Sequence, residues 1–169
     1  MNMLKDGTLP ESHLKILSLE VTNICNLRCV MCGDNGLRRE KDGTPVSKTT
    51  PHLLVRDRGR ISLENVEKIA VQCKKNMEIR LHVSGEPLAH PKLDEIIRIF
   101  RHNVDTVKIY TNAGLLTPDK SKKLIDAGVT HIQFSVDGYN DKTYLEMRTG
   151  NFQNVVQYTN HFLKISKGK

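Results

Sequence analysis

Four segments of alternating apolar and polar residues limit the fold of this chain more than any other feature. They cover residues 16–22, 78–83, 106–111 and 131–136, and a period of two is typical of β-strands with two different faces. Apolar periodicity and capping residues predict helices at residues 63–76, 91–102, 118–127, 141–147 and 152–165. Strands that alternate with helices in this way predict right-handed βα units and a parallel sheet.

The two faces of these strands differ in polarity. The apolar face carries Leu17, Leu19, Val21, Ile79, Leu81, Val83, Val107, Ile109, Thr111, Ile132, Phe134 and Val136. The other face carries Ser18, Glu20, Thr22, Arg80, His82, Ser84, Lys108, Tyr110, Asn112, His131, Gln133, Ser135 and Asp137. An ordinary parallel sheet is apolar on both faces because helices cover both. A polar second face therefore favours an α/β fold with helices outside and a hydrophilic concavity inside, a partial (βα) barrel of about four parallel units. A two-layer sheet with one bare face in water is the alternative.

The length of 169 residues fits a single domain, which we place at residues 1–169. Within it, residues 35–60 contain several prolines and glycines, and seven Lys or Arg against three Asp or Glu. A long irregular segment in a compact domain is usually functional or disordered. We therefore predict a mobile basic loop at residues 35–60.

Hydropathy and charge exclude some classes of function. No apolar run approaches the ~18 residues of a membrane helix, and the first residues lack the apolar core of a signal peptide, so we expect no membrane contact and a cytoplasmic location. The formal net charge of +7 favours acidic or phosphorylated partners. Aromatic residues do not interleave with the basic run Arg56, Arg58 and Arg60, so nucleic-acid binding is not expected.

Three of the four cysteines lie close together after the first predicted strand. Cys25, Cys29 and Cys32 have the spacing C-x3-C-x2-C, with Met31 before the last of them. Three thiolates on one loop can each bind one iron of a four-iron cluster and leave the fourth iron open. A zinc site completed by a histidine or Cys73 is one alternative, although structural zinc sites usually use paired cysteine knuckles. Disulfides are the other alternative, and they are unusual in a cysteine-poor chain with no leader.

Cys73 falls on the apolar stripe of the helix predicted at residues 63–76, so we interpret it as a core residue.

Each predicted strand ends in, or is followed by, a polar or glycine-containing motif. In chain order these are the cysteine segment, Ser84-Gly85-Glu86-Pro87, Asn112, and Ser135-Val136-Asp137. The carboxyl ends of the strands in a βα barrel lie at one edge and carry the groups that do chemistry. The sequence therefore predicts one functional site at that edge.

The cysteine spacing resembles the cluster-binding signature of the radical S-adenosylmethionine (SAM) superfamily. That family usually has an aromatic residue where this chain has Met31, and a polarizable thioether can pack against adenine much as a ring does. The resemblance implies a [4Fe-4S] cluster on Cys25, Cys29 and Cys32, with SAM chelating the open iron. It also implies that one electron from the cluster cleaves SAM to a 5′-deoxyadenosyl radical, which abstracts hydrogen from a substrate.

The later motifs extend the resemblance to SAM binding. Ser84-Gly85-Glu86-Pro87 is similar to the family's G-G-E-P segment, which implies that Glu86 and backbone carbonyls receive the SAM ammonium group. The strand ends at Asn112 and Ser135 resemble those that point at the SAM ribose or carboxylate. Arg148 matches an arginine near the SAM carboxylate, with a surface salt bridge as the alternative. The SAM-binding residues implied in this way are Met31, Ser84, Gly85, Glu86, Pro87, Asn112, Ser135 and Arg148.

Further polar residues of the second strand face are candidates for a substrate cavity. They are Glu20, His82, Tyr110, His131, Gln133 and Asp137. His82 and His131 could contact substrate or relay a proton, or they could be satisfied polar residues that line a wet interior. Asp137 could instead cap the turn that follows it. The sequence assigns no catalytic residue.

The resemblance covers residues 16–165 and is strongest to members with a C-terminal SPASM (auxiliary-cluster) domain. A family core usually has six βα units and this chain has four, so a fragment, a truncated gene product and a half completed by a partner chain are all open explanations.

The first functional hypothesis is a radical SAM enzyme acting on a peptide or small molecule, with a reducing donor such as flavodoxin or ferredoxin. The second is a non-catalytic cluster- and SAM-binding module completed by a partner chain. The third is a zinc-stabilised peptide-binding adaptor.

Overall fold

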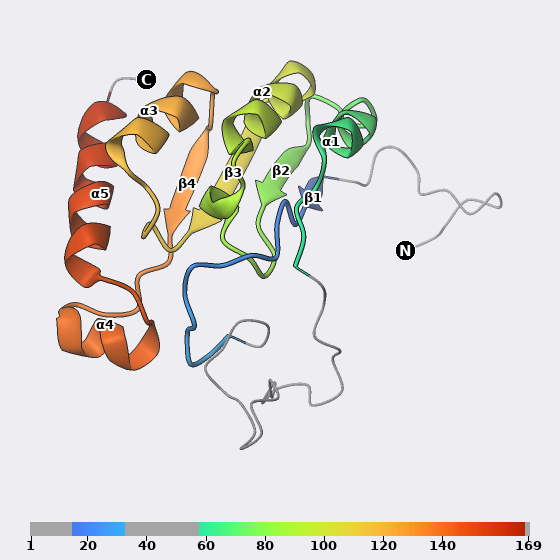
Figure 1. Cartoon of the computed structure of the whole chain (residues 1–169). Helices are drawn as coiled ribbons and strands as arrows, with labels where there is room; N and C mark the ends of the chain where they lie inside the picture. The colour runs from blue at the N-terminus through green and yellow to red at the C-terminus, as the bar shows by residue number, and fades with distance from the viewer. Residues whose placement is uncertain (1–14, 33–57, 168–169) are drawn as a thin grey trace, which may run out of the picture.

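The computed structural model describes residues 15–32 and 58–167, and its centre is one parallel sheet (Figure 1). The strands are β1 (Ile16–Ser18), β2 (Glu78–Leu81), β3 (Thr106–Thr111) and β4 (His131–Phe134). They lie in the order β1-β2-β3-β4, and each neighbouring pair is parallel. The predicted α/β fold is confirmed: four parallel strands alternate with helices and form part of a barrel.

The helices α1 (Leu63–Ala70), α2 (Leu93–Asn103) and α3 (Pro118–Asp126) lie side by side along one side of the sheet, and α5 (Phe152–Ile165) lies beside β4 (Figure 1). The short helix α4 (Asp141–Met147) precedes α5. The core lies between this helical layer and the sheet. Ile79 and Ile109 of the sheet are fully buried there, as are Ile96 and Phe100 of α2. Burying such a side chain stabilises the fold by about 1.5–3 kcal/mol.

The helices begin and end where the sequence provides the appropriate capping groups. The side chains of Ser62 and Thr117 accept hydrogen bonds from backbone amides in the first turns of α1 and α3. Asn140 and Thr143 form a capping box at the start of α4. Gly128, just after α3, has φ of +87°, a left-handed conformation that favours glycine. The bounds predicted for α4 and α5 are confirmed.

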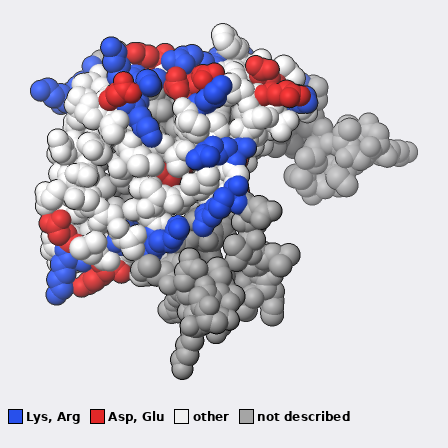
Figure 2. All heavy atoms as spheres, in the orientation of Figure 1, with Lys and Arg blue, Asp and Glu red and all other residues white. Residues whose placement is uncertain are grey.

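Charged side chains on the outer surface of the helices are mostly intermixed. Figure 2 shows Lys and Arg beside Asp and Glu over this surface. One ion pair one turn apart occurs on each of three helices: Lys68–Glu64 at 2.6 Å, Arg98–Asp94 at 2.8 Å and Lys123–Asp119 at 3.2 Å. Exposed pairs of this kind contribute little to stability, so this surface is a solvated one.

Several predicted boundaries were wrong. β1 ends at Ser18 rather than residue 22, because the chain turns away and Thr22 forms an antiparallel bridge with Arg60. α1 ends at Ala70 instead of residue 76. α2 begins at Leu93 instead of residue 91, after the short 3-10 helix η1 (Pro87–Ala89).

The apolar strand face also stops earlier than predicted. Val83 and Val136 are 50% and 37% exposed, because each lies beyond the last residue of its strand. Cys73 packs in the core as predicted, and its Sγ lies 3.5 Å from the carbonyl of Ile69.

Two further expectations concern residues that the structure covers only in part. The predicted mobile loop at residues 35–60 lies outside the described residues except for its last three. Within residues 15–32 and 58–167, no helix is long and apolar enough to cross a membrane.

Candidate functional site

The cysteine loop, residues 23–32, follows β1 and carries the three clustered thiols. None of Cys25, Cys29 and Cys32 forms a disulfide. The amide of Cys32 donates to the carbonyl of Cys29 at 3.1 Å, and the amide of Leu27 donates to Sγ of Cys25 at 3.4 Å. Cys29 is buried, whereas Cys25 and Cys32 are half-buried. The loop therefore presents three reduced thiols in one short turn, next to the exposed side chain of Met31.

The turn after β2 supports the loop from the sheet side. The amide of Glu86 donates to the carbonyl of Ile24 at 2.9 Å, and the amide of Ser84 donates to the Glu20 carboxylate at 3.0 Å. A Cβ on Gly85 would lie 2.0 Å from the carbonyl oxygen of Thr22. Only glycine permits this approach of two backbones. The Ser84–Pro87 motif therefore has a structural role, which is to let the turn after β2 pack against the backbone that leads into the cysteine loop.

Glu86 points into the protein rather than toward a ligand. Its side chain is 2% exposed and accepts hydrogen bonds from the amide of Leu88 (3.0 Å), the hydroxyl of Thr111 (2.7 Å) and the amide of Asn112 (2.8 Å). Burial raises the pKa of this carboxyl, and the three donors offset only part of that effect. This carboxylate joins the ends of β2 and β3, and its implied contact with a SAM ammonium group stays a prediction.

Asn112, at the end of β3, lies against the cysteine loop. Its Nδ2 donates to Oδ1 of Asn26 at 3.0 Å and lies 3.8 Å from Sγ of Cys25. Its Oδ1 accepts from the amide of Gly114 at 2.9 Å. Asn112 is 6% exposed. These contacts bring Asn112 to the thiols, and its predicted contact with SAM stays a prediction.

The segment around α4, residues 140–150, supports the loop from the other side. The amide of Val30 donates to the carbonyl of Met147 at 3.0 Å, and the amide of Arg28 donates to Oγ1 of Thr149 at 2.7 Å. A Cβ on Gly150 would lie 2.9 Å from Leu27. Two parts of the chain that are far apart in sequence are therefore joined at the cysteines.

Arg148 forms the third contact of this segment with the loop. Its Nη1 lies 3.6 Å from Sγ of Cys29, while Nε and Nη2 lie 2.7 and 2.5 Å from Oδ2 of Asp137. This pair is the salt bridge considered as the alternative role of Arg148, with side chains 14% (Arg148) and 43% (Asp137) exposed, and the implied contact of Arg148 with SAM stays a prediction. Burial raises the pKa of the Cys29 thiol, and the positive charge of Arg148 partly offsets that rise.

The polar face of the sheet brings together most of the predicted cavity residues. The rings of His82 and Tyr110 lie 5.2 Å apart, and Lys108 Nζ lies 5.6 Å from the Tyr110 ring centre. Burial lowers the pKa of His82, partly offset by Glu20. Gln133 is exposed at the same face, and Ser135, one residue past β4, is half-buried. These side chains form a polar surface next to the site.

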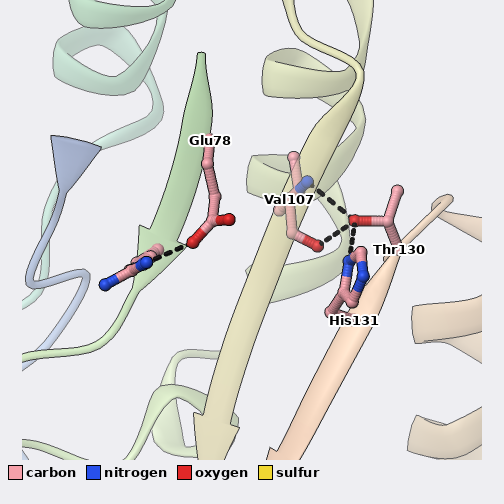
Figure 3. A network of polar contacts seen from close by, with 5 residues as sticks. Glu78, Val107, Thr130 and His131 are labelled. Atoms are coloured by element: carbon pink, nitrogen blue, oxygen red, sulfur yellow. Dashed lines mark hydrogen bonds and ion pairs between the residues drawn. The ribbon is translucent and has the colours of Figure 1, made fainter. Parts of the chain in front are cut away.

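A hydrogen-bond network lies at the amino ends of the same strands (Figure 3). Thr130 Oγ1 bonds both the amide and the carbonyl of Val107, at 3.0 and 2.8 Å, and lies 3.0 Å from Nδ1 of His131. Glu78 pairs with Arg80 on β2. Because His131 begins β4 and the motifs follow the strands, the structure separates His131 from the cysteine loop. Its assignment to the substrate cavity stays a prediction.

The three thiols of the loop are donors of the kind that hold an iron–sulfur cluster. Among the described residues, no three His, Cys, Asp or Glu side chains gather in a way that could hold one ion. In a cluster each thiolate binds a different iron, and N–H donors near the sulfurs tune it. The contacts of Leu27, Asn112 and Arg148 with cysteine sulfurs are of that kind.

A buried hydroxyl beside the loop adds to this fit. Tyr144 is fully buried and its hydroxyl has no hydrogen-bond partner in the described part of the chain. Burial raises its pKa, and the charges of Arg148 and Cys29 also act on it. Buried polar groups are usually hydrogen-bonded, so this unpaired donor near Cys29 is suited to an electron-rich group bound at the thiols.

The fold and the site together define an α/β protein that carries three cluster-type cysteines at the carboxyl edge of a parallel sheet. The family model described as the radical SAM superfamily matches residues 19–166. The chain therefore belongs to the radical SAM superfamily, as its motifs predicted.

Relatives with known names cover this chain well but are much longer. It is 31% identical over 145 residues to a GTP 3′,8-cyclase of Pelotomaculum thermopropionicum, covering 83% of this chain and 39% of that protein. It is 31% identical over 134 residues to an AdoMet-dependent heme synthase of Methanosarcina barkeri, covering 79% of this chain and 34% of that protein. The chain thus spans little more than a third of the curated relatives it matches.

Solved structures share the fold at low sequence identity. SuiB of Streptococcus suis, bound to S-adenosylmethionine, superposes with a TM-score of 0.66 at 19% identity, covering 91% of this chain and 32% of SuiB. anSMEcpe with bound AdoMet has a TM-score of 0.64 at 19% identity, covering 89% of this chain and 41% of that one. These likenesses support the partial barrel.

Proposed function

We propose that this chain is a radical SAM enzyme domain, with Cys25, Cys29 and Cys32 as ligands of a [4Fe-4S] cluster and SAM bound beside them. The observation that carries the proposal is the set of three thiols, none of them in a disulfide, held between the ends of β2 and β3 on one side and residues 140–150 on the other. Membership of the superfamily, in which such clusters and SAM are typical, supports the same assignment.

A cluster held by Cys25, Cys29 and Cys32 would supply the one-electron reduction of SAM, from which a 5′-deoxyadenosyl radical would arise to abstract hydrogen from a peptide or small molecule. The protein's own contribution is to hold and orient these groups. The exposed thioether of Met31 is available to pack on the adenine. The backbone of the Ser84–Pro87 turn and the side chain of Ser135 lie at the same edge, where they can bind the rest of SAM. The polar sheet face, with Glu20, His82, Tyr110 and Gln133, offers hydrogen bonds to a substrate.

The test is anaerobic reconstitution with iron and sulfide, followed by reduction with dithionite in the presence of SAM. We expect about four irons and four sulfides per chain, and release of 5′-deoxyadenosine. Cys29→Ser should abolish cluster uptake, and Cys73→Ser, at a core cysteine, should retain it. Stoichiometric zinc without a cluster would contradict the proposal and favour the zinc-stabilised adaptor.

A second function is favoured by the share of the relatives that the chain spans and by the four strands of the described residues. In this function the chain is a cluster- and SAM-binding module that becomes active when a partner chain completes the barrel. It predicts cluster and SAM binding by the isolated chain without cleavage of SAM. Turnover by the isolated chain, with flavodoxin or ferredoxin as donor, would exclude it.

A further inference from the structure

Asp137 and Arg148 form a polar pair that the proposed function does not use. Asp137 lies three residues after β4, and Arg148 directly follows α4. Two of the guanidinium nitrogens, Nε and Nη2, are fixed on Oδ2 of Asp137, and the remaining one, Nη1, lies 3.6 Å from Sγ of Cys29. A guanidinium has five N–H donors in a rigid plane, so two contacts with one carboxylate determine where the third nitrogen points.

The surroundings keep this geometry in place. Arg148 is only 14% exposed, and its own amide donates to the carbonyl of Tyr144 at 2.7 Å. The neighbours Met147 and Thr149 bond the backbone of the cysteine loop on either side of Cys29, at Val30 and Arg28. The backbone on both sides of Arg148 is therefore tied to the loop on both sides of Cys29, and the contacts with Asp137 hold the arginine side chain itself.

We propose that Arg148 donates a hydrogen bond to the Cys29 thiolate when the cluster is bound, and that Asp137 is the positioning residue that aims it. The proposal rests on the proposed function, since it requires a cluster on Cys29. Reduction adds one negative charge to a cluster, and hydrogen bonds to the sulfurs and nearby charge set its reduction potential. A fixed cation and donor at one thiolate stabilises the reduced form and so raises that potential.

The experiment is a redox titration of the reconstituted chain in the absence of SAM, followed by electron paramagnetic resonance of the reduced cluster. Arg148→Gln should shift the midpoint potential to a more negative value by ~59 mV. At a fixed potential, this corresponds to about a tenfold lower ratio of reduced to oxidised cluster for a one-electron couple. Arg148→Lys, which keeps the charge on a flexible chain, should recover part of the shift. Arg28→Gln is the matched control, because it removes an exposed charge next to Cys29 in sequence without a contact between its side chain and a sulfur.

Asp137 is tested by a double-mutant cycle on the same potential. In an Asp137→Asn background, Arg148→Gln should shift the potential by less than half as much, because the arginine is no longer held toward Cys29. Equal shifts in both backgrounds would overturn the positioning role. Thermal unfolding of each cluster-free variant identifies those that have lost the fold.

The outcomes separate the two proposals. An unchanged potential in Arg148→Gln, with weaker SAM binding, would make Arg148 a ligand of SAM alone and overturn this inference. A wild-type chain that takes up no cluster would overturn the proposed function and this inference together. A wild-type cluster whose potential does not respond to Arg148 overturns only the inference.

Discussion

The cysteine loop is held by two regions that differ in burial and in the kind of contact they make. At the ends of β2 and β3 the contacts are buried: Glu86 is 2% exposed, and Gly85 leaves no room for a side chain. Around α4 the contacts come from exposed or half-buried residues such as Thr149 and Arg148. Buried backbone contacts fix where the loop lies, whereas peripheral side-chain contacts can tune the sulfurs without setting the fold. The difference indicates that the two sides have separate roles in stability and chemistry.

The largest expected effect is at Gly85, on the buried side. In Gly85→Ala the new Cβ would collide with the backbone of Thr22, and such overpacking should lower the free energy of unfolding by about 3 kcal/mol. Urea unfolding of the cluster-free chain measures this. Gly59→Ala is the control, because a Cβ at Gly59 meets nothing within 4 Å. If the two variants were equally stable, the contacts at the ends of β2 and β3 would not be the ones that fix the position of the cysteine loop.

The next effect is the loss of a helix cap on the α4 side. Asn140→Ala removes the capping box of α4 and should cost about 1 kcal/mol. The contacts with the cysteine loop should loosen as well, so exchange of the Val30 amide, which bonds Met147, should become faster. Thr117→Ala removes a similar cap from α3 and should leave that exchange unchanged. If Asn140→Ala and Thr117→Ala change the exchange rate of the Val30 amide equally, residues 140–150 do not hold the cysteine loop.

A pH effect should distinguish the buried side. Burial raises the pKa of Glu86 above its ordinary value of 4.5, so the folded chain binds this proton more tightly than the unfolded chain. The associated stability is fully present below pH 4.5 and is lost as the pH rises through the raised pKa. Glu86→Gln lacks this titration, so it should gain stability relative to wild type as the pH is raised. Denaturant unfolding across this range measures the difference, and the opposite slope would show that the three donors outweigh burial.

The smallest expected effect is at Tyr144, on the α4 side. Its hydroxyl is buried and unpaired within the described residues, so Tyr144→Phe should not lower the stability of the cluster-free chain, because no hydrogen bond is lost. Thermal unfolding of the cluster-free and reconstituted forms checks this. A loss of stability confined to the reconstituted form would indicate that the hydroxyl donates to the bound cluster.

Much of the fold could be predicted from the sequence because its determinants are local. Period-two alternation located the strands, and caps such as Ser62 and Asn140 located the starts of helices. The ends of β1 and α1 could not be predicted, because they depend on a bridge with Arg60 and on packing that no local pattern encodes.

The candidate site divides in the same way. The cysteines and the motifs after the strands were visible as spacing, and the family match supports their interpretation. The inward direction of Glu86 and the link from Asp137 through Arg148 to Cys29 depend on contacts between distant segments. Thr149 and Gly150, which contact the loop, were missed; their only sequence signal is their position directly after Arg148.

The close approach of Gly85 to Thr22 has a consequence for the order of assembly. The two residues are 63 positions apart (85 − 22), so the chain between them must be made, and β2 must take its place, before the cysteine loop can adopt its final shape. Contacts between such distant segments form late because loop closure carries an entropic cost. Iron insertion on this protein should therefore follow chain collapse, and a ribosome-bound nascent chain that ends before β2 should be unable to retain iron.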